Sequence, residues 1–295
     1  MKKTNLFITG GSGFVGKNLV KQINNEYNYT YSVLSRRKTN RQNFVLGDLM
    51  DLSSLDKIIK KNDIVIHLAL SKNYPENITM TNNLLEICEK KKIKKIILLS
   101  SMAAKRNYPD EYGKTKKLVE EQVKNSKLNY TILRPTMIYG KGSTGFNFII
   151  GYLEKIPFLT PIIGNGRYIV IPVNVDDIIE TIIVCIKNKK TDKKEYDIVG
   201  GEKMYFVDLV NELKKELKIK KPNIHFPVLI CKMIATILPS VLSKDKIKNL
   251  TQGSLADIEP AKKDFGYNPK KLPNGEENGY LWKYFNEQGF YAKTT

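Results

Sequence analysis

A tyrosine and a lysine four residues apart, Tyr112 and Lys116, could carry out proton transfer. On a helix these two positions share a face, so a phenol and an ammonium group would stand side by side. An unperturbed tyrosine hydroxyl titrates near pKa ~10, and a neighbouring cation favours its phenolate form. The pair therefore predicts a group that donates and accepts a proton near neutral pH.

The position of this pair matters more than its spacing, because Tyr and Lys are abundant in the chain. The predicted helix 111–124 follows an apolar strand, 95–99, which ends in Ser100 and Ser101. A hydroxyl at the C-terminal end of a strand lies at the mouth of a parallel sheet, where ligands bind.

A glycine loop near the N-terminus predicts a second binding feature. An apolar strand, 4–9, leads into the loop 10–16 (GGSGFVG), and 17–23 has helical periodicity. Glycines let the backbone turn tightly and approach a ligand, and a helix N-terminus offers free N–H groups. This order predicts a pyrophosphate site; an ordinary glycine-rich turn is the alternative.

Strand and helix patterns alternate through the first half of the chain. Apolar strands are predicted at 4–9, 31–34, 44–46, 63–68, 95–99 and 130–133, and helices at 17–23, 52–60, 78–90 and 111–124. Such alternation indicates a parallel sheet covered on both faces. We predict an α/β fold, a Rossmann-type doubly wound parallel sheet with a smaller C-terminal substrate-binding lobe.

The pattern changes after Gly140, where a flexible loop begins. Residues 164–166 read as a hairpin-type turn, and 176–186 as a helix that starts with two acids. We predict a dinucleotide-binding domain over 1–140, with 173–200 returning to it, and a smaller substrate lobe over 141–172 and 201–295.

Taken in order, these segments resemble the short-chain dehydrogenase/reductase superfamily. The resemblance is carried by the glycine loop, 63–69 (DIVIHLA), Ser100-Ser101, the Tyr112 and Lys116 pair, 133–140 (LRPTMIYG), 164–167 (GNGR) and 172–177 (PVNVDD). They look most like its extended and atypical branch, the NAD(P)-dependent nucleotide-sugar epimerases, dehydratases and reductases.

The resemblance implies hydride transfer with a nicotinamide cofactor, which the protein positions against its substrate. Tyr112 would give or take the proton of the reacting oxygen. Lys116 would bind the nicotinamide ribose and lower the tyrosine pKa. Ser101 would hydrogen-bond the reacting oxygen, with Ser100 as the alternative.

The residues after the second predicted strand bear on the choice of dinucleotide. NAD-preferring sites usually have a carboxylate there, which binds the ribose 2′-hydroxyl, but 35–38 reads SRRK. Arg36 or Arg37 could bind a 2′-phosphate through charge-assisted bonds. We therefore predict NADP, with NAD as the alternative; the arginines could also be plain surface charge.

The remaining expected roles follow from the loop, the charges and the resemblance together. The predicted cofactor-binding set is Gly10, Gly13, Phe14, Val15, Gly16, Arg36, Arg37, Asp48, Leu49, Leu68, Ala69, Ser100, Tyr112, Lys116, Pro135 and Ile138. Asn147 and Arg167 are the substrate-side candidates, although Arg167 could equally be a surface arginine at a turn. We interpret His67 as a satisfied histidine at a strand end, and we predict no metal site.

Two features depart from the extended branch. The interval from Ser101 to Tyr112 is eleven residues, about half the usual length. Such a short loop is typical of atypical members, some of which have lost catalysis. Met80 stands where the family usually has glycine, which should narrow the space beside the cofactor.

Composition narrows the classes of function. The 295 residues carry a formal net charge of +19, which could attract nucleic acid, anionic lipid or phosphorylated substrates. The lysine runs lack interleaved aromatics, so we favour lysines spread over solvated helix faces and no nucleic-acid partner.

The cysteines and the apolar segments bear on location. Three scattered cysteines fit a reducing compartment, and the N-terminus does not read as a signal peptide, so we expect a cytoplasmic protein. No stretch predicts an integral membrane segment. The nearest, 226–242, reads as a buried helix, with a membrane-surface helix as the alternative.

Three hypotheses of function follow. We favour an NADP(H)-dependent oxidoreductase of polysaccharide biosynthesis that reduces a 4-keto nucleotide-diphosphate sugar by hydride transfer; an NAD-dependent nucleotide-sugar epimerase is the alternative. A non-catalytic dinucleotide-binding sensor or assembly protein is supported by the short loop and opposed by Tyr112 and Lys116. Nucleic-acid or membrane binding is the third. Extended relatives often form homodimers through the helices that correspond to 78–90 and 111–124.

Overall fold

A computed structural model describes residues 4–26, 29–140, 142–237, 247 and 256–272. It divides into two compact units. The first comprises Met1–Pro135, Val175–Ile198 and Ala256–Asn268, and the second comprises Thr136–Asn174, Val199–Leu255 and Pro269–Thr295.

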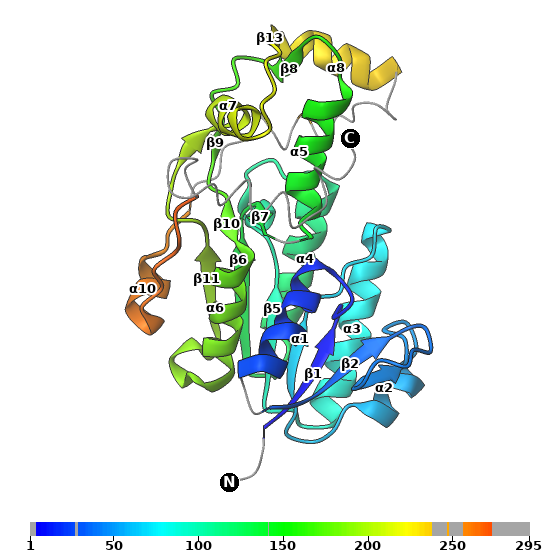
Figure 1. The fold of residues 1–295 in the computed structure, drawn as a ribbon. Helices are drawn as coiled ribbons and strands as arrows, with labels where there is room; N and C mark the ends of the chain where they lie inside the picture. The colour runs from blue at the N-terminus through cyan, green and yellow to red at the C-terminus, as the bar shows by residue number, and fades with distance from the viewer. Residues whose placement is uncertain (1–3, 27–28, 141, 238–246, 248–255, 273–295) are drawn as a thin grey trace. The chain divides into compact units, whose positions relative to one another are not determined.

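The first unit is built on a seven-stranded parallel sheet with the strand order β11-β6-β5-β4-β1-β2-β3 (Figure 1). The strands are β1 (Asn5–Thr9), β2 (Thr30–Ser35), β3 (Phe44–Leu46), β4 (Ile64–His67), β5 (Lys95–Leu99), β6 (Tyr130–Pro135) and β11 (Lys194–Ile198). The order reverses at β1, so successive crossovers place helices on both faces. The predicted doubly wound α/β fold is confirmed.

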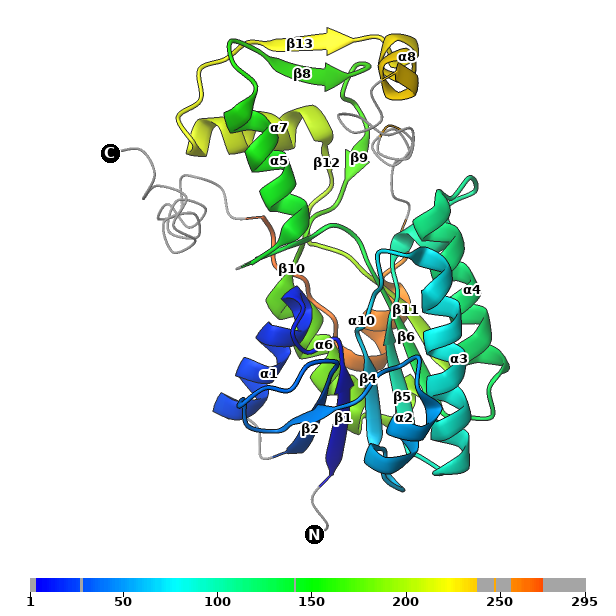
Figure 2. The same ribbon diagram turned by 90° about the vertical axis from the view of Figure 1, so that its right-hand side faces the viewer.

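Helices cover the two faces of this sheet (Figure 2). On one face α1 (Phe14–Glu26) packs beside α6 (Val175–Lys187), and on the other α3 (Tyr74–Lys90) packs between α2 (Leu52–Ile58) and α4 (Glu111–Asn125). In the described part of the chain, no helix has the length and apolar content needed to cross a bilayer.

The apolar strand residues explain why the sheet is covered on both sides. Phe7, Val65 and Ile96 point to the α3 and α4 side, where they join one buried cluster with Leu84 and Val119. Their neighbours along the strands are also buried. Because successive side chains of a strand point to opposite faces, both faces must be covered by helices.

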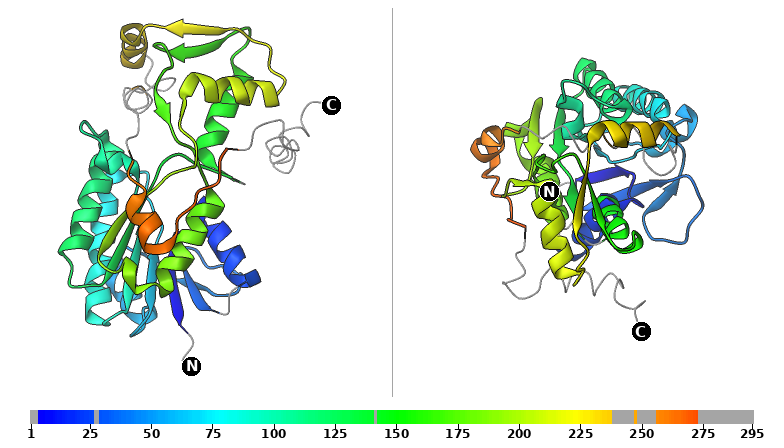
Figure 3. Two further views of the ribbon diagram at one scale, coloured as in Figure 1. Left: turned by 90° about the vertical axis from the view of Figure 1, so that its left-hand side faces the viewer. Right: turned by 90° about the horizontal axis from the view of Figure 1, so that it is seen from above.

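The second unit combines short strand pairs with helices (Figure 3). The parallel pairs are β7 (Ile138–Tyr139) with β10 (Val173–Asn174) and β8 (Thr160–Ile163) with β13 (Asn223–Phe226), and the antiparallel pair is β9 (Ile169–Val170) with β12 (Met204–Tyr205). The helices are α5 (Thr144–Lys155), α7 (Phe206–Glu216) and α8 (Val228–Ile237). Phe146, Ile150 and Leu209 lie in the core of this unit.

The predicted turn at 164–166 forms, but the strands on its two sides do not pair with each other as a hairpin. The turn itself forms, with Gly164 and Gly166 at φ +60° and +69°. However, β8 before it pairs with β13 and β9 after it pairs with β12. The turn residues were predicted correctly from the local sequence. The strand on each side of the turn, however, pairs with a strand far along the chain.

One segment also departs from the predicted boundaries. Helix α10 (Glu259–Phe265) lies within the first unit, whereas the sequence assigned all of 201–295 to the smaller lobe. The Phe265 ring packs edge-on against Tyr196 of β11 with ring centroids 5.0 Å apart. A long-range aromatic contact, which no local pattern announces, therefore ties this helix to the sheet.

Candidate active site

The glycine loop after β1 is packed too closely for larger residues. Gly10 has φ +72°, and a Cβ there would lie 2.6 Å from the backbone N of Ala69. A Cβ on Gly16 would lie 2.3 Å from the Gly10 carbonyl oxygen. The loop therefore lies against the end of β4 and against its own helix, a close approach that glycine permits.

The N-terminus of α1 directly follows this loop and suits an anion. The Lys17 N–H donates to the Gly13 carbonyl at 2.9 Å, so the N–H groups of Phe14, Val15 and Gly16 precede the first bond of the helix ladder. The first turn of α1 carries no acidic residue. This cradle and the positive end of the helix dipole fit the pyrophosphate of a dinucleotide.

The two serines after β5 have different surroundings. Ser101 accepts a hydrogen bond from the Ala103 N–H at 3.2 Å and shares a hydrogen bond with the Tyr112 side chain. The buried Ser100 hydroxyl instead donates to Glu120. Ser101 is therefore the serine beside Tyr112. The hydroxyl of Ser100 is already used in its hydrogen bond to Glu120.

Tyr112 lies in the first turn of α4, where the Asp110 carboxylate caps the helix by accepting from the Gly113 N–H at 2.9 Å. Its ring packs at a tilt against Tyr74 of α3, with centroids 5.8 Å apart. Burial raises the pKa of the Tyr112 hydroxyl, and the Ser101 hydrogen bond opposes this shift. In the protein alone, burial outweighs the favourable contacts, and the lowering of this pKa by Lys116 stays a prediction.

Lys116 stands one turn along α4 on the same face. Its Nζ lies 5.9 Å from the Tyr112 ring centroid and donates to the Leu99 carbonyl at 3.0 Å. Burial lowers the pKa of this ammonium to about 8, and the Glu120 carboxylate acts in the opposite direction. A buried cation thus links the helix to the end of β5 beside the phenol.

The short segment between Ser101 and Tyr112 is compact. Ser101 caps a single 3-10 turn, η1 (Met102–Lys105), which packs against the start of α4. A Cβ on Gly113 would lie 2.6 Å from the Ala103 carbonyl oxygen and 2.9 Å from Pro109. Gly113 therefore allows the contact that brings Ser101 to Tyr112 across an eleven-residue interval.

A buried ionic cluster lies behind α4, and the sequence reading missed it. The Arg134 Nε donates to both Glu120 oxygens, at 2.9 and 3.1 Å, and Arg134 also pairs with Glu195 of β11. Glu120 receives the Ser100 hydroxyl as well. Glu120 comes one helical turn after Lys116 and Arg134 follows the predicted strand 130–133, but no single local pattern indicates that the two side chains meet.

His67 is held in a chain of hydrogen bonds at the end of β4. Its Nδ1 lies 2.7 Å from the Thr9 hydroxyl and its Nε2 lies 3.3 Å from the Thr81 hydroxyl. Thr9 accepts from the Ala69 N–H, and Thr81 donates to the Asn77 carbonyl. Burial, together with the Lys116 charge, lowers the pKa of His67 to about 3. The imidazole is therefore neutral, with Nδ1 accepting and Nε2 donating.

The other predicted cofactor residues of the first unit lie at the same carboxyl edge of the sheet. Leu68 and Ala69 follow β4, and Pro135 ends β6. Asp48 follows β3 and accepts from the Met50 N–H at 3.0 Å. The Leu49 side chain is buried in the core, so a ligand would meet its backbone rather than its side chain.

Arg36 and Arg37 are exposed just beyond β2. The positive charge of Arg36 contributes to a lowered pKa of Glu76, whose carboxylate also receives Ser71 and Asn73. The arginine that was predicted to hold a 2′-phosphate therefore acts electrostatically on a carboxylate of α3.

The predicted residues of the second unit fall on three elements. Ile138 is in β7, Arg167 is exposed after the 164–166 turn, and Asn147 is on α5. The Asn147 side-chain oxygen is buried and has no hydrogen-bond partner, which is unusual for a polar atom in a folded protein.

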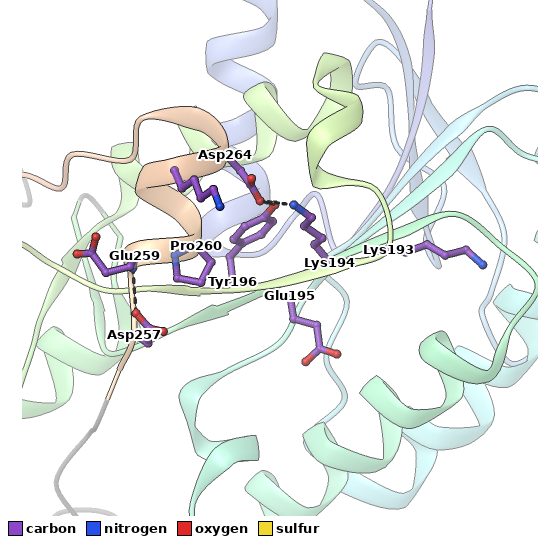
Figure 4. A pocket seen from close by; sticks show the side chains of 9 residues that line it. Lys193, Lys194, Glu195, Tyr196, Asp257, Glu259, Pro260 and Asp264 are labelled. Atoms are coloured by element: carbon purple, nitrogen blue, oxygen red, sulfur yellow. Dashed lines mark hydrogen bonds and ion pairs between the residues drawn. The ribbon is translucent and has the colours of Figure 1, made fainter.

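A separate pocket opens at the amino end of β11, beside α10 (Figure 4). Lys194 and Tyr196 both bind the Asp264 carboxylate there, at 2.6 and 2.7 Å. None of the predicted site residues lines this pocket. Across the described residues, no group of three or more His, Cys, Asp or Glu side chains is arranged to hold a metal ion.

Comparison with known proteins decides the family. The model of the NAD dependent epimerase/dehydratase family matches residues 6–199. The chain belongs to this family. The match begins in β1 and ends just past β11, and so covers the glycine loop, Ser101, Tyr112 and Lys116. This family is the epimerase and dehydratase part of the extended branch, and the sequence resembles that branch.

Two 4-epimerases are similar to this chain along most of their length. The chain is 25% identical to a UDP-glucose 4-epimerase of Vibrio cholerae, covering 90% of both proteins. It is 28% identical to the N-acetyl-alpha-D-glucosaminyl-diphospho-ditrans,octacis-undecaprenol 4-epimerase of Escherichia coli O157:H7, covering 76% of this chain and 75% of that protein.

Solved structures share the fold at lower identity. A UDP-glucose 4-epimerase from Thermotoga maritima, solved with UDP-glucose, has a TM-score of 0.73 and 22% identity, covering 96% of this chain and 99% of that one. A dTDP-glucose 4,6-dehydratase from Streptomyces venezuelae, solved with NAD, has a TM-score of 0.76 and 16% identity, covering 98% of each chain.

Proposed function

We propose that this protein is an NAD-dependent 4-epimerase of a sugar carried on a diphosphate. The observation that carries the proposal is the grouping of Ser101, Tyr112 and Lys116 at the end of β5, with the glycine cradle in the same unit. Epimerase relatives that match over most of their length support the choice of reaction.

Residues of this chain would hold a dinucleotide at its pyrophosphate, at its nicotinamide ribose and at its adenine. The glycine loop and the first turn of α1 would hold the pyrophosphate, and Lys116 would bind the nicotinamide ribose. Bound NAD would supply the hydride acceptor and donor for the sugar carbon. The backbone at Asp48 and Leu49 lies at the same edge and would contact the adenine.

Tyr112 would act as the base and then as the acid on the sugar hydroxyl. Its raised pKa means that it needs help to lose a proton. Ser101 supplies part of this help through its hydrogen bond, and the buried charge of Lys116 supplies the rest as a ligand excludes water. A single residue can serve both directions, because an epimerase returns the proton that it takes.

The diphosphate is the chemistry that the relatives' substrates share, while the carrier differs between them. Arg167 could pair with a diphosphate, and the unpartnered Asn147 oxygen could accept from a sugar hydroxyl. We propose a nucleoside diphosphate as the carrier. A cytoplasmic location and a role in polysaccharide biosynthesis belong to the same proposal.

A second candidate is the reduction of a 4-keto nucleotide sugar with NADPH. The exposed Arg36 and Arg37 favour it, since they could bind a 2′-phosphate. A dinucleotide-binding sensor without turnover is disfavoured by the complete acid–base group.

The test is to incubate the purified protein with UDP-glucose and with UDP-N-acetylglucosamine, with NAD present and no reductant. We expect the corresponding 4-epimers by chromatography, and none from Tyr112→Phe. Turnover only with NADPH and a 4-keto sugar would replace the epimerase by the reductase. Absence of any product from either class would leave the sensor hypothesis.

A further inference from the structure

Helix α8 of the second unit exposes an apolar face that the proposed function does not use. Leu229, Met233 and Ile237 are 71%, 58% and 74% exposed. They are spaced by four residues, so they form one stripe along the helix. Ile230 and Ile234, also exposed, widen this stripe.

The opposite face of α8 fixes the orientation of the helix. Cys231 and Ala235 are buried there, against Ile163 of β8 and Phe226 of β13. Because the opposite face of α8 already packs against the unit, a small rotation of the helix would not bury the exposed stripe. Contiguous exposed apolar side chains of this size usually mark an interaction surface.

The charge of α8 and of the segment that leads into it indicates the partner of the stripe. From Leu217 to Ile237 the chain has no acidic residue and four lysines. Lys232 is exposed on α8 itself, whereas the exposed Lys218 and Lys220 precede the other end of β13. Figure 2 shows β13 leading into α8 along one edge of this unit. An apolar stripe on a helix with one lysine and no acidic residue complements a surface with an apolar interior and a negatively charged outer layer.

We propose that α8 docks this unit onto a bilayer that contains anionic phospholipids. The stripe would lie in the plane of the interface at the level of the acyl chains, and Lys232 beside it would meet the headgroup phosphates. A ten-residue helix is far too short to span the hydrocarbon core, so this is surface binding. The inference goes beyond the proposed epimerase and does not depend on it.

Co-sedimentation of the full chain with vesicles tests the proposal without any turnover. We expect binding to vesicles of phosphatidylcholine with phosphatidylglycerol, weaker binding to phosphatidylcholine alone, and a further loss as salt rises. The triple variant Leu229→Gln, Met233→Gln, Ile237→Gln should bind about tenfold less or weaker still. The matched control, Leu46→Gln with Leu118→Gln, removes exposed leucines of the first unit and should bind like the wild type.

A fluorescence measurement keeps the proposal testable if the triple variant does not fold. Met233→Trp should shift its emission to the blue on anionic vesicles and be quenched by brominated lipid, beyond the wild-type background. Failure of the wild type to bind anionic vesicles overturns the proposal. So does unchanged binding by the triple variant, or a dimer in ultracentrifugation that the triple variant dissociates while no vesicle binding is seen.

Discussion

At the scale of single residues, the account rests on the Tyr112 hydroxyl. Tyr112→Phe removes the proton donor and leaves the ring packed against Tyr74. We expect kcat to fall about 10²- to 10⁴-fold, while the Kd for the dinucleotide changes little. Steady-state kinetics and a fluorescence titration with the dinucleotide measure the two effects.

Tyr108→Phe is the control for this change. Tyr108 lies four residues before Tyr112, in the short segment between Ser101 and Tyr112, and is 73% exposed. It should keep wild-type kcat. If Tyr112→Phe also kept most of its kcat, the acid–base assignment would be wrong.

The neutral His67 predicts a specific loss of stability in acid. Its pKa is about 3 in the folded protein and 6.5 in an unfolded chain. Between these values the unfolded state binds more protons, so the free energy of unfolding falls as pH drops below 6.5. The contribution amounts to about 2 kcal/mol between pH 7 and pH 5.

Urea unfolding at pH 7 and pH 5 measures this contribution. His67→Gln should be less stable at pH 7 but should lose less on acidification than the wild type. His225→Gln, which changes the exposed histidine of the second unit, should keep the wild-type pH dependence. Equal slopes for the wild type and His67→Gln would contradict a buried neutral imidazole.

The arginines after β2 separate the two dinucleotides. If they bind a 2′-phosphate, replacing Arg36 and Arg37 by Ala should raise the Kd for NADPH about tenfold or more and leave that for NADH nearly unchanged. Isothermal titration with both reduced dinucleotides decides this. Equal weakening of both, or of neither, removes the 2′-phosphate argument and with it the main support for the reductase.

At the scale of elements, the contact between η1 and α4 positions Ser101. Gly113→Ala would put a methyl group 2.6 Å from the Ala103 carbonyl oxygen, so η1 must move. We expect a loss of about 1–3 kcal/mol in the free energy of unfolding and a lower kcat, because Ser101 caps η1. Urea unfolding and kinetics on the same preparation measure both.

The matched control is Gly151→Ala in α5, where a Cβ would meet nothing within 4 Å. Alanine is the better helix former, so this change should stabilise the protein by about 0.5–1 kcal/mol. Equal effects of the two substitutions would contradict a steric role for Gly113.

The sequence correctly predicted those elements that are each marked by a single local pattern. The order of strands and helices through β6, the glycine turn and the shared face of Tyr112 and Lys116 all follow from short periodicities. Glu120 with Arg134, and α10 on β11, depend on residues far apart in the chain, which no window of sequence compares. The roles of the site residues in catalysis stay predictions.

The pKa of Tyr112 shows the same limit in energetic terms. Adjacent charge can be read from the spacing of Tyr112 and Lys116, but burial of the hydroxyl depends on Tyr74 and on the sheet edge. Desolvation is a property of the folded surroundings. The sequence therefore predicted the neighbours of Tyr112, but the burial that raises its pKa could not be read from the spacing.

At the scale of the whole molecule, the segment that shows the family and the lysine-bearing segment before and within α8 are different parts of the chain. The family match covers the parallel sheet and its glycine loop, whereas the acid-free, lysine-bearing stretch that ends in α8 lies outside it. The net charge of +19 is thus not a single signal. Its lysines also serve inside the fold: Lys95 is buried and binds Asp192 at 2.6 Å.

The most direct test of the central claim is the dinucleotide that the protein itself holds. The purified protein is denatured, any released dinucleotide is identified by chromatography and mass, and the emptied protein is titrated with NAD and NADPH. An epimerase recycles its cofactor, so we predict that NAD is released at close to one per chain and that NAD rebinds. Protein that releases nothing and binds NADPH but not NAD would contradict the account.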